Sequence, residues 1–147
     1  MQSRFRSGIA IAVLVLLVGI GLYLSRSMTQ DTGPDLDLSR SKATEQSFYV
    51  ATITPEDGEP KVGPLHSWVL ALTTADGTPV EGASVSVDGG MPNHNHGLPT
   101  APRVTADLGE GRYRIEGVKF SMPGWWVLTV TVDGPQGADR ATFNLML

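Results

Sequence analysis

From Trp126 onwards, the segment "WWVLTVTV" at positions 125–132 alternates between apolar and polar side chains. Successive side chains of a β-strand point to opposite faces, so this alternation predicts a strand with one buried and one exposed face. The buried face consists of Trp126, Leu128, Val130 and Val132. Because an apolar sheet face has to be covered, the segment restricts the chain to folds in which this sheet packs against a second layer.

Segments with a similar alternation recur after residue 46 and are separated by Gly, Pro and Asp, which favour turns. No segment after residue 46 has the apolar period of a helix. Short strands with one apolar face each pack most economically as two sheets, so we predict an all-β, immunoglobulin-like β-sandwich of about seven strands. The predicted strands are residues 47–54, 65–74, 83–88, 103–108, 111–118, 125–132 and 140–147.

A long apolar segment, "GIAIAVLVLLVGIGLYL", occupies residues 8–24. The uncharged stretch around it extends from residue 7 to residue 25, and as a helix it would span about 28 Å. This length is close to the ~30 Å thickness of the hydrocarbon core of a bilayer. We therefore predict a cytoplasmic N-terminus at residues 1–7, followed by one N-terminal transmembrane helix at residues 8–24.

The charges around this segment predict its orientation. Arg4 and Arg6 precede it and only Arg26 follows closely, which places the C-terminal domain outside the cytoplasm. The alternative is a cleaved signal peptide. However, the sequence "LYLSRSMTQ" has bulky residues where a cleavage site requires small ones. This favours an uncleaved, single-pass anchor in the inner (cytoplasmic) membrane.

Residues 25–46 are polar, carry mixed charges and lack an apolar period, so we predict a flexible linker before a β-sandwich domain at residues 47–147. The chain contains no cysteine, which excludes disulfides, thiolate metal sites and cysteine nucleophiles. Its net charge of −4 provides no basic surface of the kind that binds nucleic acid. The domain must therefore be stabilised by its hydrophobic core.

The segment "GGMPNHNHGLPTAP" at residues 89–102 contains the residues that most resemble a binding site. His94 and His96 are two positions apart, so in an extended segment they point the same way and can converge on one ion. Met91 precedes them, and Met122 lies in a second loop that a sandwich would bring to the same end. Methionine and histidine together suit copper, especially Cu(I), whereas imidazole alone also suits Zn(II) or Ni(II).

A second interpretation of the same residues requires no metal. The two histidines can be solvated side chains of a loop that Gly and Pro turn and stiffen. Each of the two methionines precedes a proline, and either can be an apolar plug at the end of the sandwich. The sequence leaves both interpretations open.

Two further aromatic residues are candidates for a functional role. His66 has the same strand parity as Trp68, so we expect it at a strand end or at the rim of the core. Trp125 has the opposite parity from Trp126. It is either an exposed anchor for a partner protein or a cover for the loop beside it, and we favour the second role.

We do not expect this chain to be an enzyme. It has no Gly-x-Ser-x-Gly turn for a nucleophilic serine and no Gly-rich phosphate loop before a helix. The carboxylates of Glu56, Asp57 and Glu59 lie in a loop rich in Gly and Pro, where solvation is their expected role.

Four motifs follow one another between Met91 and Val132. They are Met-Pro followed by His-x-His-Gly, then Pro-x-x-Pro, then Gly-x-Tyr-x-x-x-Gly, and finally Met-Pro-Gly-x-Trp at the start of an alternating strand. In these motifs the chain resembles the YtkA-like/FixH-like family of bacterial membrane-anchored envelope proteins. One position departs from the pattern, because similar sequences are expected to have a histidine where this chain has Ser121.

FixH-like relatives are associated with copper handling and with the assembly of haem–copper oxidases. The resemblance therefore implies a periplasmic or extracytoplasmic accessory protein that binds copper at Met91, His94, His96 and Met122. It also implies an envelope partner such as an oxidase or a copper-transfer protein. The alternative is a metal-free binding or scaffolding module of the cell envelope.

Overall fold

The computed structural model describes residues 35–147. The predicted cytoplasmic N-terminus, the predicted transmembrane helix at residues 8–24 and residues 25–34 of the predicted linker lie outside the described residues. Within residues 35–147, no helix is both long enough and apolar enough to cross a membrane. Residues Leu36–Leu147 form one compact unit.

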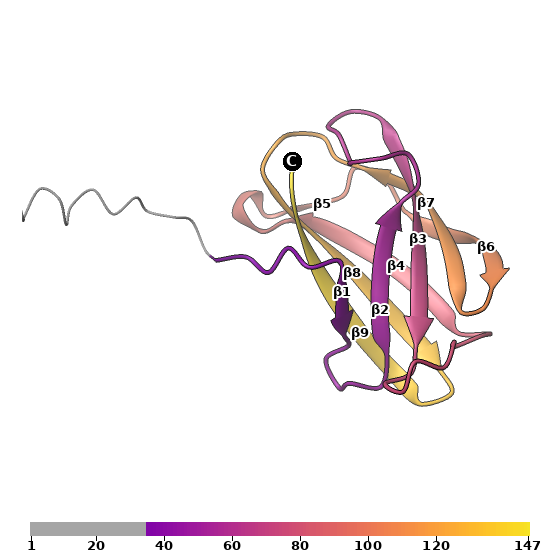
Figure 1. Ribbon diagram of the computed structural model, residues 1–147. Helices are drawn as coiled ribbons and strands as arrows, with labels where there is room; N and C mark the ends of the chain where they lie inside the picture. The colour runs from indigo at the N-terminus through magenta and orange to yellow at the C-terminus, as the bar shows by residue number, and fades with distance from the viewer. Residues whose placement is uncertain (1–34) are drawn as a thin grey trace, which may run out of the picture. The chain divides into compact units, whose positions relative to one another are not determined.

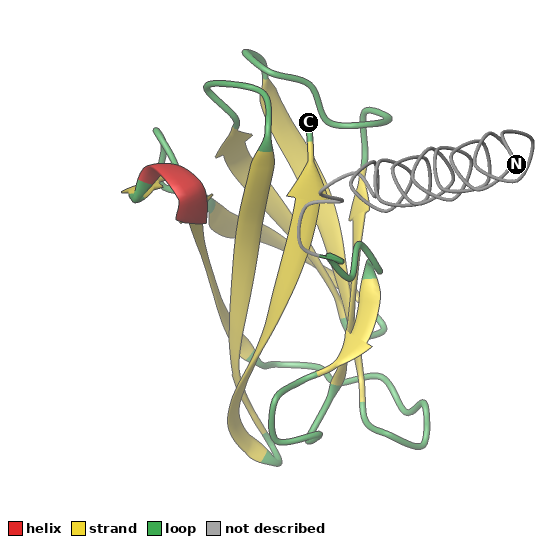
Figure 2. Ribbon diagram, turned by 90° about the vertical axis from the view of Figure 1, so that its left-hand side faces the viewer, coloured by secondary structure: helices red, strands yellow, loops and turns green. Residues whose placement is uncertain are grey.

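The described residues form two antiparallel sheets (Figures 1 and 2). The first sheet has the strand order β1-β2-β3-β7-β6, and the second has the order β5-β4-β8-β9. The strands of the first sheet are β1 (Ser41–Ala43), β2 (Val50–Pro55), β3 (Leu65–Thr73), β7 (Arg112–Lys119) and β6 (Arg103–Gly109). Those of the second are β5 (His96–Gly97), β4 (Ser84–Met91), β8 (Trp125–Gly134) and β9 (Gly137–Met146).

The apolar faces of the two sheets share one hydrophobic core. The face predicted for β8 is buried as expected, and the facing side chains of β3 come from Trp68, Leu70 and Leu72. Five further strands were also located at positions close to the predicted ones. The prediction of an all-β fold built from two antiparallel sheets is therefore confirmed, whereas its immunoglobulin-like form stays a prediction.

The structure differs from the sequence prediction around residue 40. The short strand β1 lies within the range predicted as linker, and it pairs with β2 so that Ala43 faces Val50. The first predicted strand begins three residues later than expected, because Ser47 has a left-handed backbone (φ 60°) in the turn between the two strands. A polar three-residue strand held by backbone pairing has no apolar alternation, so the pattern that identified the other strands does not detect it.

The turn between β6 and β7 requires glycine for two different reasons. Gly109 and Gly111 both have positive φ, at 73° and 68°. A Cβ atom added at Gly111 would lie 2.4 Å from the carbonyl oxygen of Leu72 and 2.8 Å from the amide nitrogen of Val80, whereas a Cβ atom at Gly109 would meet nothing within 4 Å. Only Gly111 is therefore required by close packing as well as by its backbone conformation.

We predict that Gly111→Ala destabilises the domain more than Gly109→Ala does. Both substitutions should cost ~1–2 kcal/mol for placing a Cβ atom on a left-handed backbone. Gly111→Ala should cost a further ~1–3 kcal/mol because the neighbouring backbone has to move. Urea unfolding of both variants measures the difference, and equal free energies of unfolding would contradict the close approach at Gly111.

A buried carboxylate ties the turn after β1 to β9. Asp139, which is 5% exposed, accepts hydrogen bonds from the backbone amides of Gln46 (3.1 Å), Phe48 (3.2 Å) and Arg140 (2.8 Å). Burial on its own would raise the pKa of this carboxyl. The hydroxyl of Thr44 and the three amides outweigh burial and lower the pKa below its ordinary value.

This lowered pKa predicts how stability depends on pH. A carboxyl whose pKa is lower in the folded state stabilises the fold above its unfolded pKa of about 3.9, and this contribution is lost as the pH falls through the folded value. Asp139→Asn should therefore cost ~1–2 kcal/mol at pH 7 and much less at pH 2. The matched control is Asp133→Asn at an exposed position of β8. Urea unfolding at several pH values measures the free energy of unfolding of both variants. The same dependence on pH in the two variants would contradict the prediction.

Candidate metal centre

The histidine segment is built as a tight return of the chain at the end of β4. The strand β4 extends to Met91, a single 3-10 turn (η1) covers Pro92–His94, and β5 returns antiparallel to β4. Asn95 makes the return possible with a left-handed backbone (φ 51°). A Cβ atom at Gly90 would lie 2.4 Å from the carbonyl oxygen of His96, so glycine is needed for β5 to close on β4.

The structure places the two histidines side by side, but for a different reason from the predicted one. The segment is not extended at His94, which belongs to η1, and the left-handed Asn95 turns the chain between the two histidines. Their ring centroids are 6.0 Å apart at an interplanar angle of 41°. Both residues are exposed. The two imidazoles are therefore neighbours that an ion can reach from solvent.

A hydrogen bond orients the ring of His96. Its Nδ1 atom is 2.9 Å from the carbonyl oxygen of Gly97, which can only accept a hydrogen bond. Nδ1 must therefore carry the proton, and Nε2 keeps the lone pair with which imidazole binds a metal. A carbonyl that fixes the tautomer in this way is a common feature around metal-binding histidines.

Trp126 lies below His96 and connects it to the second loop. The centroid of its ring is 5.5 Å from that of His96, with the two rings at 71°. The same ring also packs against that of Phe120, with the ring centroids 5.3 Å apart. Its indole Nε1 donates a hydrogen bond of 3.0 Å to the carbonyl oxygen of Met122. This buried side chain therefore brings the two predicted loops together at one end of the sandwich.

The two methionines differ in accessibility. Met91 is 2% exposed and belongs to the hydrophobic core, whereas Met122 is 36% exposed. The Cε atom of Met91 lies 3.0 Å from the position that a Cβ atom of Gly124 would take, so its thioether lies against the loop that contains Met122. The burial of Met91 matches the alternative role of an apolar plug, and its position beside the second loop matches the predicted ligand set.

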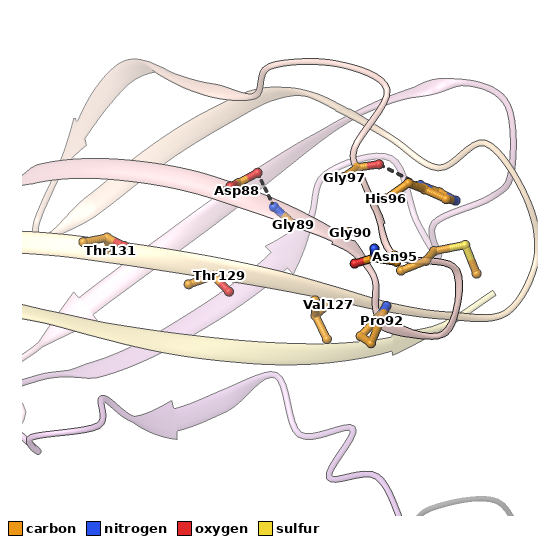
Figure 3. A pocket seen from close by; sticks show the side chains of 11 residues that line it. Asp88, Gly89, Gly90, Pro92, Asn95, His96, Gly97, Val127, Thr129 and Thr131 are labelled. Atoms are coloured by element: carbon orange, nitrogen blue, oxygen red, sulfur yellow. Dashed lines mark hydrogen bonds between the residues drawn. The ribbon is translucent and has the colours of Figure 1, made fainter.

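The donors available at this end are soft or borderline ones. Within residues 35–147, no three His, Asp or Glu side chains come together in the way that would hold a metal ion. The predicted ligands are two imidazoles and two thioethers, a combination that favours Cu(I) over hard cations. An open hollow lies beside His96 on β4 and β8, as Figure 3 shows, and its lining includes Asp88, Asn95 and Thr129.

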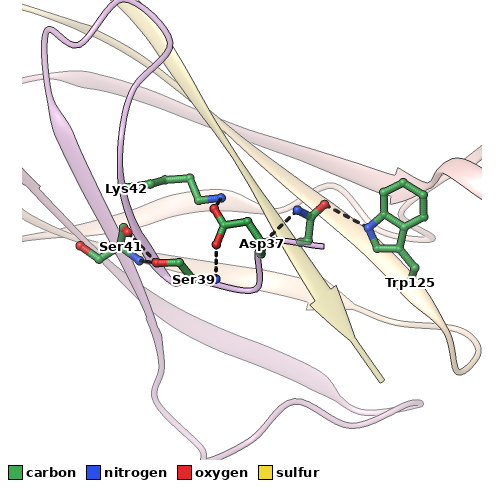
Figure 4. A network of polar contacts seen from close by, with 6 residues as sticks. Asp37, Ser39, Ser41, Lys42 and Trp125 are labelled. Atoms are coloured by element: carbon green, nitrogen blue, oxygen red, sulfur yellow. Dashed lines mark hydrogen bonds and ion pairs between the residues drawn. The ribbon is translucent and has the colours of Figure 1, made fainter. Parts of the chain in front are cut away.

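The other aromatic candidates have structural contacts. His66 is 6% exposed, and its Nε2 atom lies 2.8 Å from the carbonyl oxygen and 3.1 Å from the amide nitrogen of Lys61. It lies next to the end of β3, as expected. The indole Nε1 of Trp125 donates to the side-chain oxygen of Asn144 (3.0 Å), whose amide group donates to the carbonyl oxygen of Asp37 (2.9 Å; Figure 4). Trp125 thus helps to hold the segment before β1 against the second sheet.

Two contributors to this end of the molecule were missed by the sequence analysis. The strand parity of Trp126 predicted its burial, but no sequence signal indicated that His96 would rest on its ring. Gly124 was noted only as part of the Met-Pro-Gly-x-Trp motif, whereas in the structure the absence of its side chain leaves room for Met91. Both contacts join residues about 30 positions apart in the sequence, which local patterns do not encode.

The comparison with known families agrees with the motifs and with the fold. The YtkA-like family model matches residues 43–131, which is more than half of the chain, so the chain belongs to the YtkA-like family. The matched range begins at the end of β1 and includes both loops of the candidate metal centre. The chain has no significant match among curated proteins or among solved structures.

The hydrogen bond of His96 leads to a prediction about its tautomer. We expect His96 in the metal-free protein at neutral pH to carry its proton on Nδ1, because that atom donates to Gly97. Long-range ¹H–¹⁵N correlation spectra distinguish protonated from unprotonated ring nitrogens. His94 is the internal control, because no hydrogen bond of its ring is found within the described residues. An Nε2-protonated His96 would contradict this geometry.

Proposed function

We propose that this protein is a membrane-anchored envelope accessory that binds Cu(I) transiently through Met91, His94, His96 and Met122. The observation that carries the proposal is the pair of exposed imidazoles, whose ring centroids are 6.0 Å apart. Met91 directly precedes the turn that contains them, and Met122 lies in the second loop at the same end of the sandwich. Cu(I) is the common cellular cation whose preferences best match imidazole and thioether donors without carboxylates.

The exposure of the site favours transfer over permanent binding. A structural metal site is normally closed by four ligands and buried. Here both histidines are exposed and Met122 is partly exposed, so an incoming ligand from another protein can reach the ion. Ser121 provides no imidazole at the position where similar sequences are expected to have one, which leaves the coordination open. These features suit a carrier that delivers copper to a partner.

The proposal extends to the role of the family and to the location of the protein. The FixH-like resemblance supports a role in copper handling or in the assembly of a haem–copper oxidase. The uncharged segment at residues 8–24 supports a single-pass anchor in the inner membrane, with the domain outside the cytoplasm. An anchored carrier of this kind would act close to an oxidase or to another copper-transfer protein of the envelope.

We predict that replacing both histidines by alanine weakens Cu(I) binding by at least ~100-fold, which corresponds to about 2.7 kcal/mol. The reason is that His94→Ala/His96→Ala removes both nitrogen donors and leaves only thioethers. The measurement is an anaerobic competition between the protein and a chromophoric Cu(I) chelator. An unchanged affinity of the double variant would exclude this site.

A pair of methionine variants tests the second loop. Met122→Leu should lower the Cu(I) affinity about tenfold, because it removes a thioether while keeping a similar volume. Met146→Leu is the matched control, since Met146 is also exposed but lies on β9, outside the candidate set. Equal affinities of the two variants would remove Met122 from the ligand set. If the parent protein binds no stoichiometric copper, the metal-free scaffolding function becomes the better account.

A further inference from the structure

The described fold has four sheet edges, and three of them are short, irregular or covered. The edge strand β1 has only three residues. The edge strand β6 contains two register shifts against β7. The edge strand β9 is flanked by the segment before β2, because the amide of Glu45 donates to the carbonyl of Arg140 and Asn144 donates to Asp37. These features hinder the addition of another strand.

The edge of β4 is neither short nor irregular, and most of its length is not paired with another strand. The strand β5 pairs with β4 only at Gly90 and Met91, and the amide of Leu98 bonds to Gly89, so no strand is hydrogen-bonded to the part from Ser84 to Asp88 on that side. The pairing of this part with β8 on the other side is regular and contains no bulge. A regular strand with an open side is a template for strand addition.

The backbone groups that are free along this edge can be identified. The carbonyl of Gly89 accepts a bond from the amide of Leu98, so the groups of Gly89 point away from β8. In an antiparallel sheet this direction alternates, so the amides and carbonyls of Val85 and Val87 also point away from β8. Beyond this pair, the amide of Ala83 is bonded to the hydroxyl of Tyr113. The amide of Gly89 is bonded to the carboxylate of Asp88, so the four unbonded groups on this side between Ser84 and Gly89 are the amides and carbonyls of Val85 and Val87.

We propose that β4 pairs with β4 of a second copy of this chain, antiparallel and with a two-fold axis at Ser86. Among antiparallel registers, this one joins all four free groups, because each Val85 then faces Val87 of the other copy and exchanges two hydrogen bonds with it. The side chains of these valines are partly buried in the single chain, and the pairing covers them further. The two four-stranded sheets become one continuous sheet.

The charges along this side of the molecule agree with such an arrangement. In the proposed register Asp88 lies opposite Ser84 of the other copy, so the carboxylate meets a hydroxyl. The two Asp88 side chains are four residues apart along the strands, roughly 14 Å, which exceeds the ~8 Å screening length at physiological salt.

Cysteine cross-linking tests the register directly, because the chain has no cysteine of its own. Directly opposed residues in a non-hydrogen-bonded antiparallel pair have Cα atoms about 4.5 Å apart, within the range of a disulfide. Ser86→Cys in the full chain should therefore form a disulfide-linked dimer under mild oxidation at least about ten times faster than Thr131→Cys. Thr131 is the matched control, because it is exposed and faces Ser86 on the inner strand β8.

A reversible experiment tests the same axis without a covalent bond. Ser86→Lys and Ser86→Asp each place two like charges next to each other at the axis, so each variant should fail to dimerise. In sedimentation velocity, each full-length variant should be monomeric at concentrations where the parent chain forms dimers. A mixture of the two variants should form dimers again. A monomeric parent chain, equal cross-linking of the Ser86→Cys and Thr131→Cys variants, or a mixture that stays monomeric would each overturn the proposal.

Discussion

The packing of Trp126 between the two sheets is the interaction on which both the core and the candidate metal centre depend. Its ring is fully buried against Phe120, and on its outer side it supports the imidazole of His96. The same indole donates a hydrogen bond to the loop that contains Met122. One side chain thus stabilises the end of the sandwich and sets the positions of two loops that are far apart in the sequence. The candidate site therefore combines a buried, packed side chain, Trp126, with histidine side chains that are exposed to solvent.

Much of the fold follows from local patterns. The alternation in β8 and β3 identified the buried faces correctly, because a half-buried strand needs an apolar residue at every second position. The same reasoning missed β1 and β5, which have three and two residues and rely on backbone pairing with a neighbour. It also ended β4 too early, since Gly89 and Gly90 have the composition of a turn. In the structure these glycines continue the strand, because the backbones of neighbouring strands approach them closely.

The candidate site was less predictable than the fold. The sequence identified two histidines and two methionines near one end of a sandwich, and the structure places the loops that contain them next to each other. It left open whether Met91 is a ligand or a buried apolar plug, because the space beside Gly124 depends on long-range packing. Nor did it predict the geometry of the histidine pair, which depends on the left-handed backbone of Asn95. The side-chain types indicated the chemistry, whereas the distances depend on contacts between distant segments.

The brevity of β5 has a consequence for the timescale on which this end of the molecule works. A return segment that pairs at two positions opens at a much lower free energy than the sheets beneath it, because only a few interactions have to break. The tip that carries His94 and His96 can therefore fluctuate locally many times during one lifetime of the folded core. The departure of an ion held there would therefore not require global unfolding.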